Sequence, residues 1–244
     1  MTLDLPVIVL CGGLGTRLRP AVADRPKALA PVGAGRPFLE VQLELLRARG
    51  ARRFVLCVGH MADQIEGAFG DGAALGVRID YVRDGETLLG TAGALKRAER
   101  FFAPAALVVN GDTYMDVDLA RVSRTHSSSR ATGAVATLTL AHVPDASRYG
   151  AIEFDGDRVT HFREKEPGAG QGGWVNAGVY LIERALLDRV PAGVAVSLER
   201  DVFPAALRDG LALAAFPQEA TFHDIGTPDA LRNFVTNRDV THVA

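Results

Sequence analysis

The run Leu-Cys-Gly-Gly-Leu-Gly-Thr-Arg-Leu-Arg-Pro at residues 10–20, followed by Arg-Pro-Lys-Ala-Leu-Ala-Pro at residues 25–31, indicates the fold of this chain. The apolar segment from Val7 to Cys11 is short enough to be a buried strand, and it breaks at once into glycines. Glycine lets main-chain N–H groups approach an anion, and arginine adds a rigid fork of charged donors that suits phosphate oxygens. The stretch therefore predicts a phosphate-binding loop, to which we assign Leu10, Gly12, Gly13, Gly15, Thr16, Arg17 and Lys27.

Two common glycine motifs do not match this loop. A P-loop needs glycine, four residues and then Gly-Lys-Ser or Gly-Lys-Thr, and no such run follows Gly12 or Gly13. A dinucleotide fingerprint counted from Gly13 has Leu18 in place of its third glycine. A tight turn after a strand would explain the glycines alone, but the arginines and the Pro-Lys pair that follow favour phosphate binding.

Composition narrows the class of protein. The chain has 244 residues, of which 48% are hydrophobic, so it can bury a sizeable core, and we expect one domain. Its net charge of -2 argues against nucleic-acid or membrane-surface partners, which usually need a basic excess. No apolar run is long enough to span a bilayer. Cys11 and Cys57 lie in apolar runs, so we interpret them as reduced cysteines of the core. Because thiols stay reduced in the cytoplasm, they predict a cytoplasmic protein.

Strand-like and helix-like segments alternate after the loop. Residues 37–49 and 61–69 have the pattern of amphipathic helices, each followed by glycine, whereas residues 54–58 and 77–82 read as strands. A long alternating strand at 131–140 and a hairpin around the Asp-Gly pair at 155–156 follow later. The pattern predicts an α/β fold with a doubly wound, mostly parallel, Rossmann-like mixed sheet and a smaller antiparallel portion.

An acidic residue follows the apolar strand predicted at 106–109, in the run Asn110-Gly111-Asp112-Thr113. A carboxylate at the carboxyl end of a parallel strand faces the ligand crevice, and an acid opposite a triphosphate most usefully binds Mg²⁺. Gly-Asp after a strand is also a common turn. Asp112 is nevertheless our first candidate ligand for Mg²⁺.

The glycine loop resembles the signature of the sugar-1-phosphate nucleotidyltransferases, Gly-Gly-x-Gly-Thr-Arg-Leu-x-Pro followed by Pro-Lys-Pro, with Ala28 in place of the last proline. Other motifs of this family follow in its order: Leu-Gly-Thr-Ala-Gly at 89–93, Gly-Asp at 111–112, Arg-Tyr-Gly at 148–150, Glu-Lys at 164–165, Asn-Ala-Gly at 176–178 and Asp-x-Gly-Thr-Pro at 224–228. Members of the family join a nucleoside triphosphate to a sugar 1-phosphate and release pyrophosphate.

The resemblance implies a role for each matched residue. Asp112 and Asp224 would hold Mg²⁺, Arg17 the leaving pyrophosphate, Lys27 the phosphates near the reacting centre and Lys165 the sugar phosphate. Gly90, Thr91 and Gly111 would contact the nucleotide, and Gly150, Glu164 and Asn176 the sugar. Residues 1–130 would form a nucleotide-binding part, residues 131–226 a sugar-phosphate-binding part and residues 227–244 a C-terminal helix.

Within the family the chain is most similar to bacterial D-glycero-α-D-manno-heptose 1-phosphate guanylyltransferases, on the evidence of residues 10–18, 110–113 and 148–150. Those enzymes make GDP-heptose for capsules and surface glycans, so the resemblance implies GTP and that heptose 1-phosphate as substrates, and a homo-oligomer. Mannose 1-phosphate guanylyltransferases, thymidylyl- and uridylyltransferases and a non-catalytic nucleotide-sugar sensor are the alternatives. Glu86 is a hypothesis for base selection, because one carboxylate can accept both neighbouring N–H donors of guanine.

Overall fold

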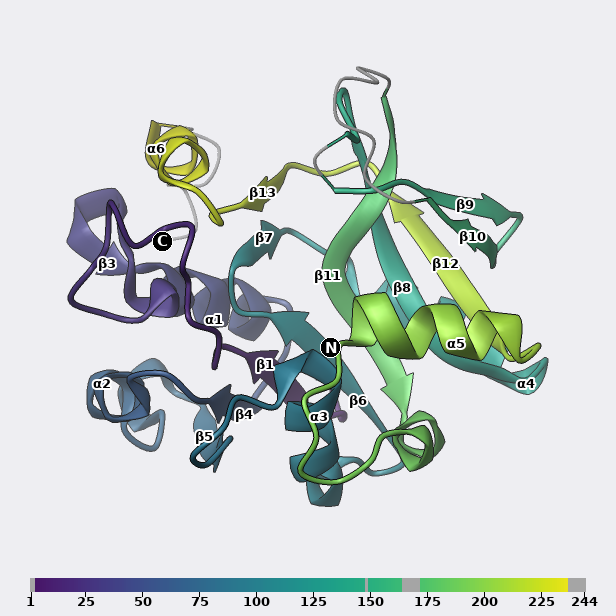
Figure 1. The fold of residues 1–244 in the computed structure, drawn as a ribbon, viewed down its shortest axis with the longest axis horizontal. Coiled ribbons are helices and arrows are strands. Elements are labelled where there is room, and N and C mark those ends of the chain that lie inside the picture. The colour runs from purple at the N-terminus through teal and green to yellow at the C-terminus, as the bar shows by residue number, and fades with distance from the viewer. Residues whose placement is uncertain (1–2, 148, 164–171, 237–244) are drawn as a thin grey trace.

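The computed structural model describes residues 3–147, 149–163 and 172–236, and its centre is a nine-stranded sheet with helices on both faces (Figure 1). Side chains of the first strand alternate between the faces, so that Val7 and Val9 enter one apolar core and Ile8 the other. The first core lies under α1 (Phe38–Ala48), α2 (Ala62–Phe69) and α4 (Leu119–Ala131). The second lies under α3 (Gly90–Arg97) and α5 (Phe203–Arg208). The predicted doubly wound mixed sheet is confirmed.

The sheet has a parallel half and a mixed half. Its strand order is β5-β4-β1-β6-β11-β8-β12-β10-β9. The parallel half consists of β5 (Arg78–Arg83), β4 (Arg53–Val58), β1 (Val7–Leu10) and β6 (Ala105–Asn110). The mixed half consists of β11 (Gly173–Glu183), β8 (Ala134–Val143), β12 (Ala212–Gln218), β10 (Arg158–Phe162) and β9 (Ile152–Asp155). The antiparallel portion thus continues the same sheet, because β11 pairs with β6 on one edge and with β8 on the other.

A small second sheet brings the Gly-Asp motif at 111–112 close to the Asp-x-Gly-Thr-Pro motif at 224–228. Its strands are β7 (Thr113–Met115), directly after the Gly-Asp pair, and β13 (Phe222–Asp224), which lies next to α6 (Pro228–Thr236). They pair antiparallel, with Thr113 opposite Asp224. A third sheet joins β2 (Pro31–Val32) to β3 (Arg36–Pro37).

The strand predicted at 131–140 extends over Ala134–Val143, and several helical elements are short turns. Helix α3 begins at Gly90, has Leu89 as its N-cap and is followed by a 3₁₀ turn at Glu99–Phe101. Residues Leu198–Val202 form a π-helical turn that leads into α5, and the Ser197 side chain caps it by accepting a hydrogen bond from the Arg200 N–H. Other 3₁₀ turns lie at Lys27–Leu29, Gly33–Gly35, Ala73–Leu75 and Arg184–Arg189.

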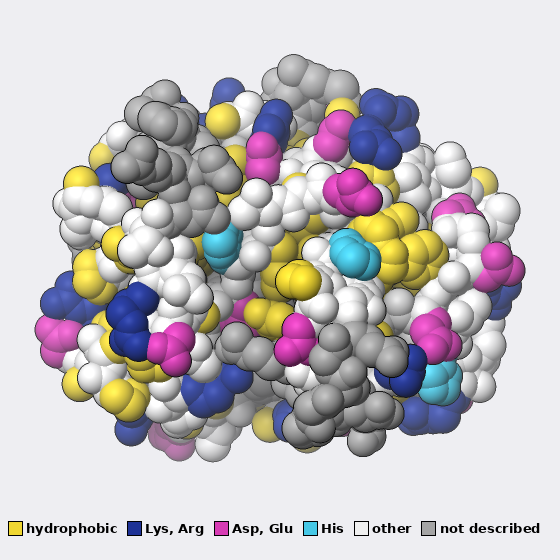
Figure 2. Space-filling model, turned by 90° about the horizontal axis from the view of Figure 1, so that it is seen from above, with side chains coloured by type: hydrophobic (Ala, Val, Ile, Leu, Met, Phe, Trp, Pro, Cys, Tyr) yellow, Lys and Arg dark blue, Asp and Glu magenta, His cyan; other side chains and the backbone are white. Residues whose placement is uncertain are grey.

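One face of the surface has mixed charge, and both thiols lie in the core. On the face shown in Figure 2, basic and acidic side chains are interspersed instead of forming one basic patch. Cys11 and Cys57 are free and buried, as predicted, and burial raises the pKa of the Cys11 thiol to about 12. Among the described residues, no helix has both the length and the apolar character that crossing a bilayer requires.

Candidate active site

A cavity of about 380 Å³ opens at the carboxyl ends of the parallel strands. Leu10 ends β1, Asn110 ends β6, and Asp84 follows β5 directly, so three strands deliver side chains to the same edge of the sheet. Most of the predicted nucleotide and phosphate residues line this cavity: Leu10, Gly12, Gly13, Gly15, Thr16, Arg17, Lys27, Gly90, Thr91, Gly111 and Asp112.

The glycine loop is held close to β4 and to Lys27. A side chain at Gly12 would meet the backbone nitrogen of Gly59 at 3.0 Å, and one at Gly15, whose φ is +59°, would meet Cβ of Lys27 at 3.2 Å. No atom lies within 4 Å of the corresponding position at Gly13. In the described part of the chain, no backbone carbonyl accepts a hydrogen bond from the N–H groups of residues 13–17. The loop therefore presents amide donors that an anion can use.

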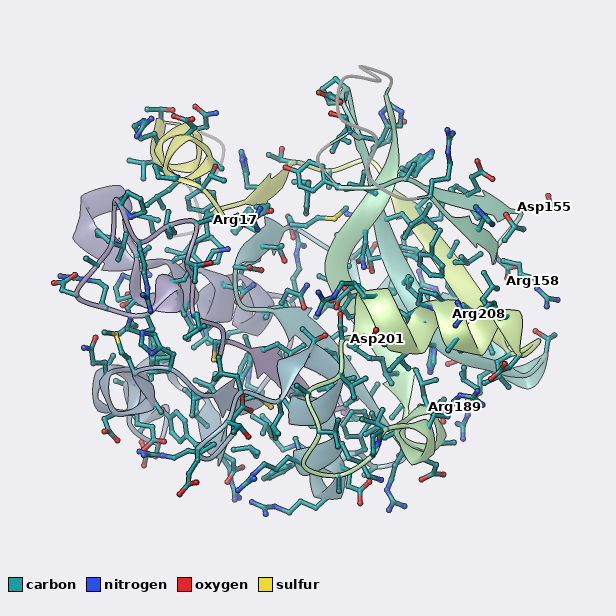
Figure 3. All side chains as sticks on the ribbon, in the orientation of Figure 1. Arg17, Asp155, Arg158, Arg189, Asp201 and Arg208 are labelled. Carbon is teal, nitrogen blue, oxygen red and sulfur yellow. The ribbon has the colours of Figure 1, made fainter. Side chains whose placement is uncertain are left out.

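Two carboxylates and two cations meet beside Gly226. Lys27 Nζ lies 2.7 Å from Asp112 Oδ2 and 3.8 Å from Asp224 Oδ1. A Cβ on Gly226 would come within 2.7 Å of Asp224 Oδ1, 3.1 Å of the Arg17 guanidinium and 3.3 Å of Lys27 Nζ, so a side chain there would shift these groups. Arg17 is labelled in Figure 3, beside β13. The pairing of β7 with β13 explains why Asp224, which is 112 positions after Asp112, reaches the same place.

This donor set fits a divalent cation that is bound together with phosphate. Mg²⁺ in phosphate-transfer sites usually has one or two carboxylate ligands and completes its shell with phosphate oxygens and water. Asp112 and Asp224 lie close enough for one ammonium to contact both. Among the residues the structure describes, no group of three or more His, Cys, Asp or Glu side chains is placed to hold a metal ion.

Asp84 is a carboxylate in the cavity wall that the sequence analysis missed. It is 6% exposed, and its Oδ2 accepts a hydrogen bond from the Leu89 N–H at 3.2 Å, while its buried Oδ1 has no partner. Burial raises the pKa of this carboxyl, and the nearby Arg97 opposes that rise. Glu86, the residue expected to select the base, is exposed and does not line the cavity. Asp84 follows the parallel strand β5, just as Asp112 follows the parallel strand β6, so the same sequence feature points to both carboxylates.

Glu199 is a second missed carboxylate, and it joins the nucleotide side of the cavity to β11. It accepts hydrogen bonds from Thr91 Oγ1 at 2.8 Å, Tyr180 Oη at 3.1 Å and Asn110 Nδ2 at 3.4 Å. Thr91 in turn accepts one from the Leu198 N–H at 2.7 Å. Burial, followed by the negative charge of Glu199, raises the pKa of Tyr180 well above its usual value. Thr91 therefore anchors the segment around residue 198.

The predicted sugar residues are less fully described. Asn176 does not line the cavity, but its Nδ2 donates to Tyr180 Oη at 2.8 Å, one hydrogen bond away from Glu199. Gly150 has a φ of +80° and also lies outside the cavity lining. Glu164 and Lys165, together with Arg148 of the Arg-Tyr-Gly motif, lie outside the described residues.

Comparison with known proteins identifies the family of this chain. The family model described as nucleotidyl transferase matches residues 6–239. A mannose-1-phosphate guanylyltransferase of Mycobacterium tuberculosis is 40% identical over 93% of this chain, which spans 63% of that relative's length. A D-glycero-α-D-manno-heptose 1-phosphate guanylyltransferase of Campylobacter jejuni is 33% identical over 96% of this chain and 100% of its own. The solved structure of HddC from Yersinia pseudotuberculosis, complexed with GMP-PN, has a TM-score of 0.81 and 29% identity over 95% of this chain and 98% of its own. The chain described here belongs to the nucleotidyl transferase family.

Proposed function

We propose that this protein transfers GMP from GTP to a sugar 1-phosphate, with D-glycero-α-D-manno-heptose 1-phosphate as its first substrate. The products are GDP-heptose, a precursor for capsule or surface polysaccharide, and pyrophosphate. The observation that carries the proposal is Asp84, a buried carboxylate in the wall of the cavity that the family's phosphate-binding residues also line. A heptose 1-phosphate guanylyltransferase that this chain matches over its whole length supports the choice of sugar.

Asp84 supplies the argument for guanine. Guanine presents neighbouring N1–H and 2-amino donors, and an ionised carboxylate accepts hydrogen bonds only. A ligand that presents donors to this carboxylate gains hydrogen bonds to a charged group, which contribute more than neutral ones. Uracil and thymine offer one N–H donor in the corresponding place, so Asp84 favours guanine over them. The relatives from M. tuberculosis and C. jejuni are both guanylyltransferases by name.

The chemistry is an in-line displacement at the α-phosphorus of GTP. A phosphate oxygen of the sugar 1-phosphate forms the new O–P bond, the bond between the α-phosphorus and its bridging oxygen breaks, and the electron pair leaves with pyrophosphate. Such reactions depend on alignment and charge neutralisation and little on covalent catalysis by the protein. The amides of the glycine loop and Arg17 bind the triphosphate, and Lys27 neutralises charge next to the reacting phosphorus.

Asp112 and Asp224 are the residues that would hold Mg²⁺. The bound cation would supply Lewis-acid neutralisation of charge on the reacting phosphate oxygens. The sequence predicts that Lys165 does the same for the incoming sugar phosphate, and that Glu164 and Asn176 bind hydroxyl groups of the sugar. Gly150 would let the ring approach the backbone.

Mannose 1-phosphate is the second candidate acceptor. The M. tuberculosis relative is named for it and is 40% identical, although this chain spans only 63% of that protein. The two sugars share the manno configuration of the ring, and the heptose differs beyond C5. Selection between them therefore depends on contacts beyond C5 and not on the residues that bind the phosphate.

The cellular setting of this proposal is the cytoplasm, which supplies GTP and keeps thiols such as Cys11 and Cys57 reduced. We also propose a homo-oligomer, as the family resemblance implies. Light scattering of the purified protein tests that assignment independently of the reaction.

A grid of activity assays tests the function. Pyrophosphate release is measured with Mg²⁺ for GTP, UTP, dTTP, CTP and ATP against the heptose, mannose and glucose 1-phosphates. We expect the largest kcat/KM for GTP with the heptose. A preference for mannose 1-phosphate would replace the sugar assignment, a preference for another base would overturn the role of Asp84, and no release with any pair would favour the nucleotide-sugar sensor.

A further inference from the structure

Gln42 is a buried polar residue in a helix that otherwise packs apolar side chains against the sheet. It lies on α1 between Val41 and Leu43 and is 2% exposed. The proposed mechanism does not use it. An amide buried in an apolar core is unfavourable unless its donors find partners, so its contacts indicate what it does there.

The Gln42 amide nitrogen donates two hydrogen bonds to one turn of backbone. Its acceptors are the carbonyl oxygen of Asn110, at 2.9 Å, and that of Thr113, at 2.6 Å. These carbonyls stand on either side of Gly111 and Asp112, where the chain passes from β6 to β7. These acceptors also determine the orientation of the Gln42 amide. If the amide were flipped, Oε1 would face two carbonyl oxygens and could not form a hydrogen bond with either. A single side chain therefore ties together both ends of the turn that carries Asp112.

The same turn also contacts the segment that carries the second carboxylate, Asp224. Thr113 pairs with Asp224 between β7 and β13, and the Ile225 N–H donates to the Asp112 carbonyl at 3.0 Å. On the other side, a Cβ added to Gly178 would come within 2.8 Å of Thr113 Oγ1, so the turn is closely packed there too. A change in the position of the turn would therefore move Asp112 and Asp224 together.

We propose that Gln42 is a positioning residue for the divalent cation: by clamping the Asn110–Thr113 turn, it keeps Asp112 and Asp224 directed at one cation. This inference rests on the proposed function, because it takes those two carboxylates as the ligands. Mutation of a group that hydrogen-bonds to metal ligands and orients them typically lowers metal affinity or activity by about 10- to 100-fold. Gln42 acts through its N–H donors, since its Oε1 is buried without a partner.

The test is Mn²⁺ binding to the complete protein, measured by electron paramagnetic resonance without nucleotide. Gln42→Met keeps the length of the side chain and removes the donors, and we expect its dissociation constant for Mn²⁺ to rise about 10-fold. Gln42→Asn keeps the amide but is one methylene too short to reach both carbonyls, and we expect the same direction of change. Asp112→Asn is the positive control, and its binding should be lost.

Leu46→Ala is the matched structural control, because Leu46 is buried on the same helix, 5% exposed, and does not contact the turn by any hydrogen bond. It should lower the melting temperature and leave Mn²⁺ affinity unchanged. With the catalytic assay in hand, kcat of Gln42→Met should recover at raised Mg²⁺ while KM for both substrates changes less than about twofold.

Failure of this inference is distinguishable from failure of the proposed function. An unchanged Mn²⁺ dissociation constant in folded Gln42→Met or Gln42→Asn overturns the inference, and so does a wild-type protein that binds no Mn²⁺. If the Gln42 variants bind Mn²⁺ more weakly but the wild type turns over no substrate pair, the positioning role stands and the proposed function falls.

Discussion

Lys27 Nζ donates a hydrogen bond to Asp112 Oδ2 at 2.7 Å, and both residues line the cavity together with the glycine loop. The ammonium thereby stands next to both proposed metal ligands, with Asp224 Oδ1 3.8 Å away. We predict that Lys27→Met leaves two carboxylates without their neutralising charge, so that added Mg²⁺ raises its melting temperature more than that of the wild type. The same variant should lose about 10²- to 10³-fold in kcat, as do other enzymes that lose one group neutralising transition-state charge.

Lys96 provides the control for Lys27, since Lys96 Nζ also lies 2.7 Å from a carboxylate, Glu99, but away from the cavity. Lys96→Met should show the Mg²⁺ response and the turnover of the wild type. Equal Mg²⁺ responses in Lys27→Met and the wild type would mean that Asp112 and Asp224 do not share a cation site.

Replacing Asp84 should weaken the selection of guanine. Asp84→Asn can no longer accept two donors, and hydrogen bonds to a charged group contribute about 1.5–3 kcal/mol, so kcat/KM for GTP should fall roughly 10- to 100-fold. Inosine triphosphate lacks the 2-amino group, and the wild type should therefore prefer GTP over it. The ratio of kcat/KM for these two nucleotides is the measurement, and it should approach unity in the variant.

Glu86→Gln decides between the two acidic residues that follow β5. Glu86 is exposed, so we expect no change in the ratio of GTP to inosine triphosphate. If Glu86→Gln removes the preference and Asp84→Asn keeps it, the base is read at residue 86 as the sequence first suggested.

The glycines of the Leu-Gly-Thr-Ala-Gly motif have a packing role that predicts a loss of stability. A Cβ on Gly93 would lie 2.5 Å from the Val194 carbonyl oxygen, and one on Gly90 would lie 2.6 Å from that of Val196. Gly93→Ala should therefore lower the free energy of unfolding by about 1–3 kcal/mol, the usual cost of overpacking. Urea denaturation measures this change.

Gly67→Ala is the opposite case and serves as the control. Gly67 lies inside α2, and nothing is within 4 Å of its added Cβ. The substitution should raise the free energy of unfolding by about 0.5–1 kcal/mol, because alanine loses less backbone entropy in a helix. A destabilised Gly67→Ala together with an unaffected Gly93→Ala would contradict the packing described here.

His126 makes the stability of the fold depend on pH. The side chain is buried, with Nδ1 2.9 Å from Thr137 Oγ1 and Nε2 3.0 Å from Glu183 Oε1. Burial lowers its pKa from 6.5, although Glu183 opposes the shift. The unfolded chain therefore binds the proton first, so the contribution of His126 to stability is complete above 6.5 and is lost as pH falls towards the folded pKa.

Urea unfolding between about pH 7.5 and 5.5 measures this dependence, because an unperturbed histidine titrates near pH 6.5. His126→Gln should reduce the loss of stability in that interval. His161, exposed on β10, is the matched control, and His161→Gln should leave the dependence unchanged. An identical pH profile for His126→Gln and the wild type would exclude His126 as its source.

Local patterns predicted much of the fold, and long-range contacts account for what they missed. The glycine loop, Asp112 and the paired strands at 152–162 follow from signals a few residues long. By contrast, Gly93 packs against Val194, a hundred positions later, and no local rule says which backbone would lie there. Gln42 has the helical spacing of a core residue, and only the turn at Asn110 and Thr113 shows why an amide stands there.

The sequence pointed most directly to those residues of the cavity wall that follow the end of a strand. Asp84 meets that condition but was passed over for Glu86, which has the same chemistry two positions further on. Glu199 had no such signal, because its partners Thr91, Asn110 and Tyr180 come from three other parts of the chain. Side chains recruited by packing in this way become visible only once the fold is known.

Strand β11 joins the parallel half of the sheet to the mixed half through hydrogen bonds on both of its edges. It pairs with β6, which ends at Asn110, and with β8, and it carries Asn176 and Tyr180 itself. The spacing between neighbouring strands is fixed at about 4.8 Å by their hydrogen bonds. The proposed binding positions of the sugar phosphate and of the triphosphate thus lie on one continuous sheet. Their separation would be set when the protein folds. Two reactants bound along such a sheet would therefore meet at a fixed distance, and binding would not have to draw two parts of the protein together.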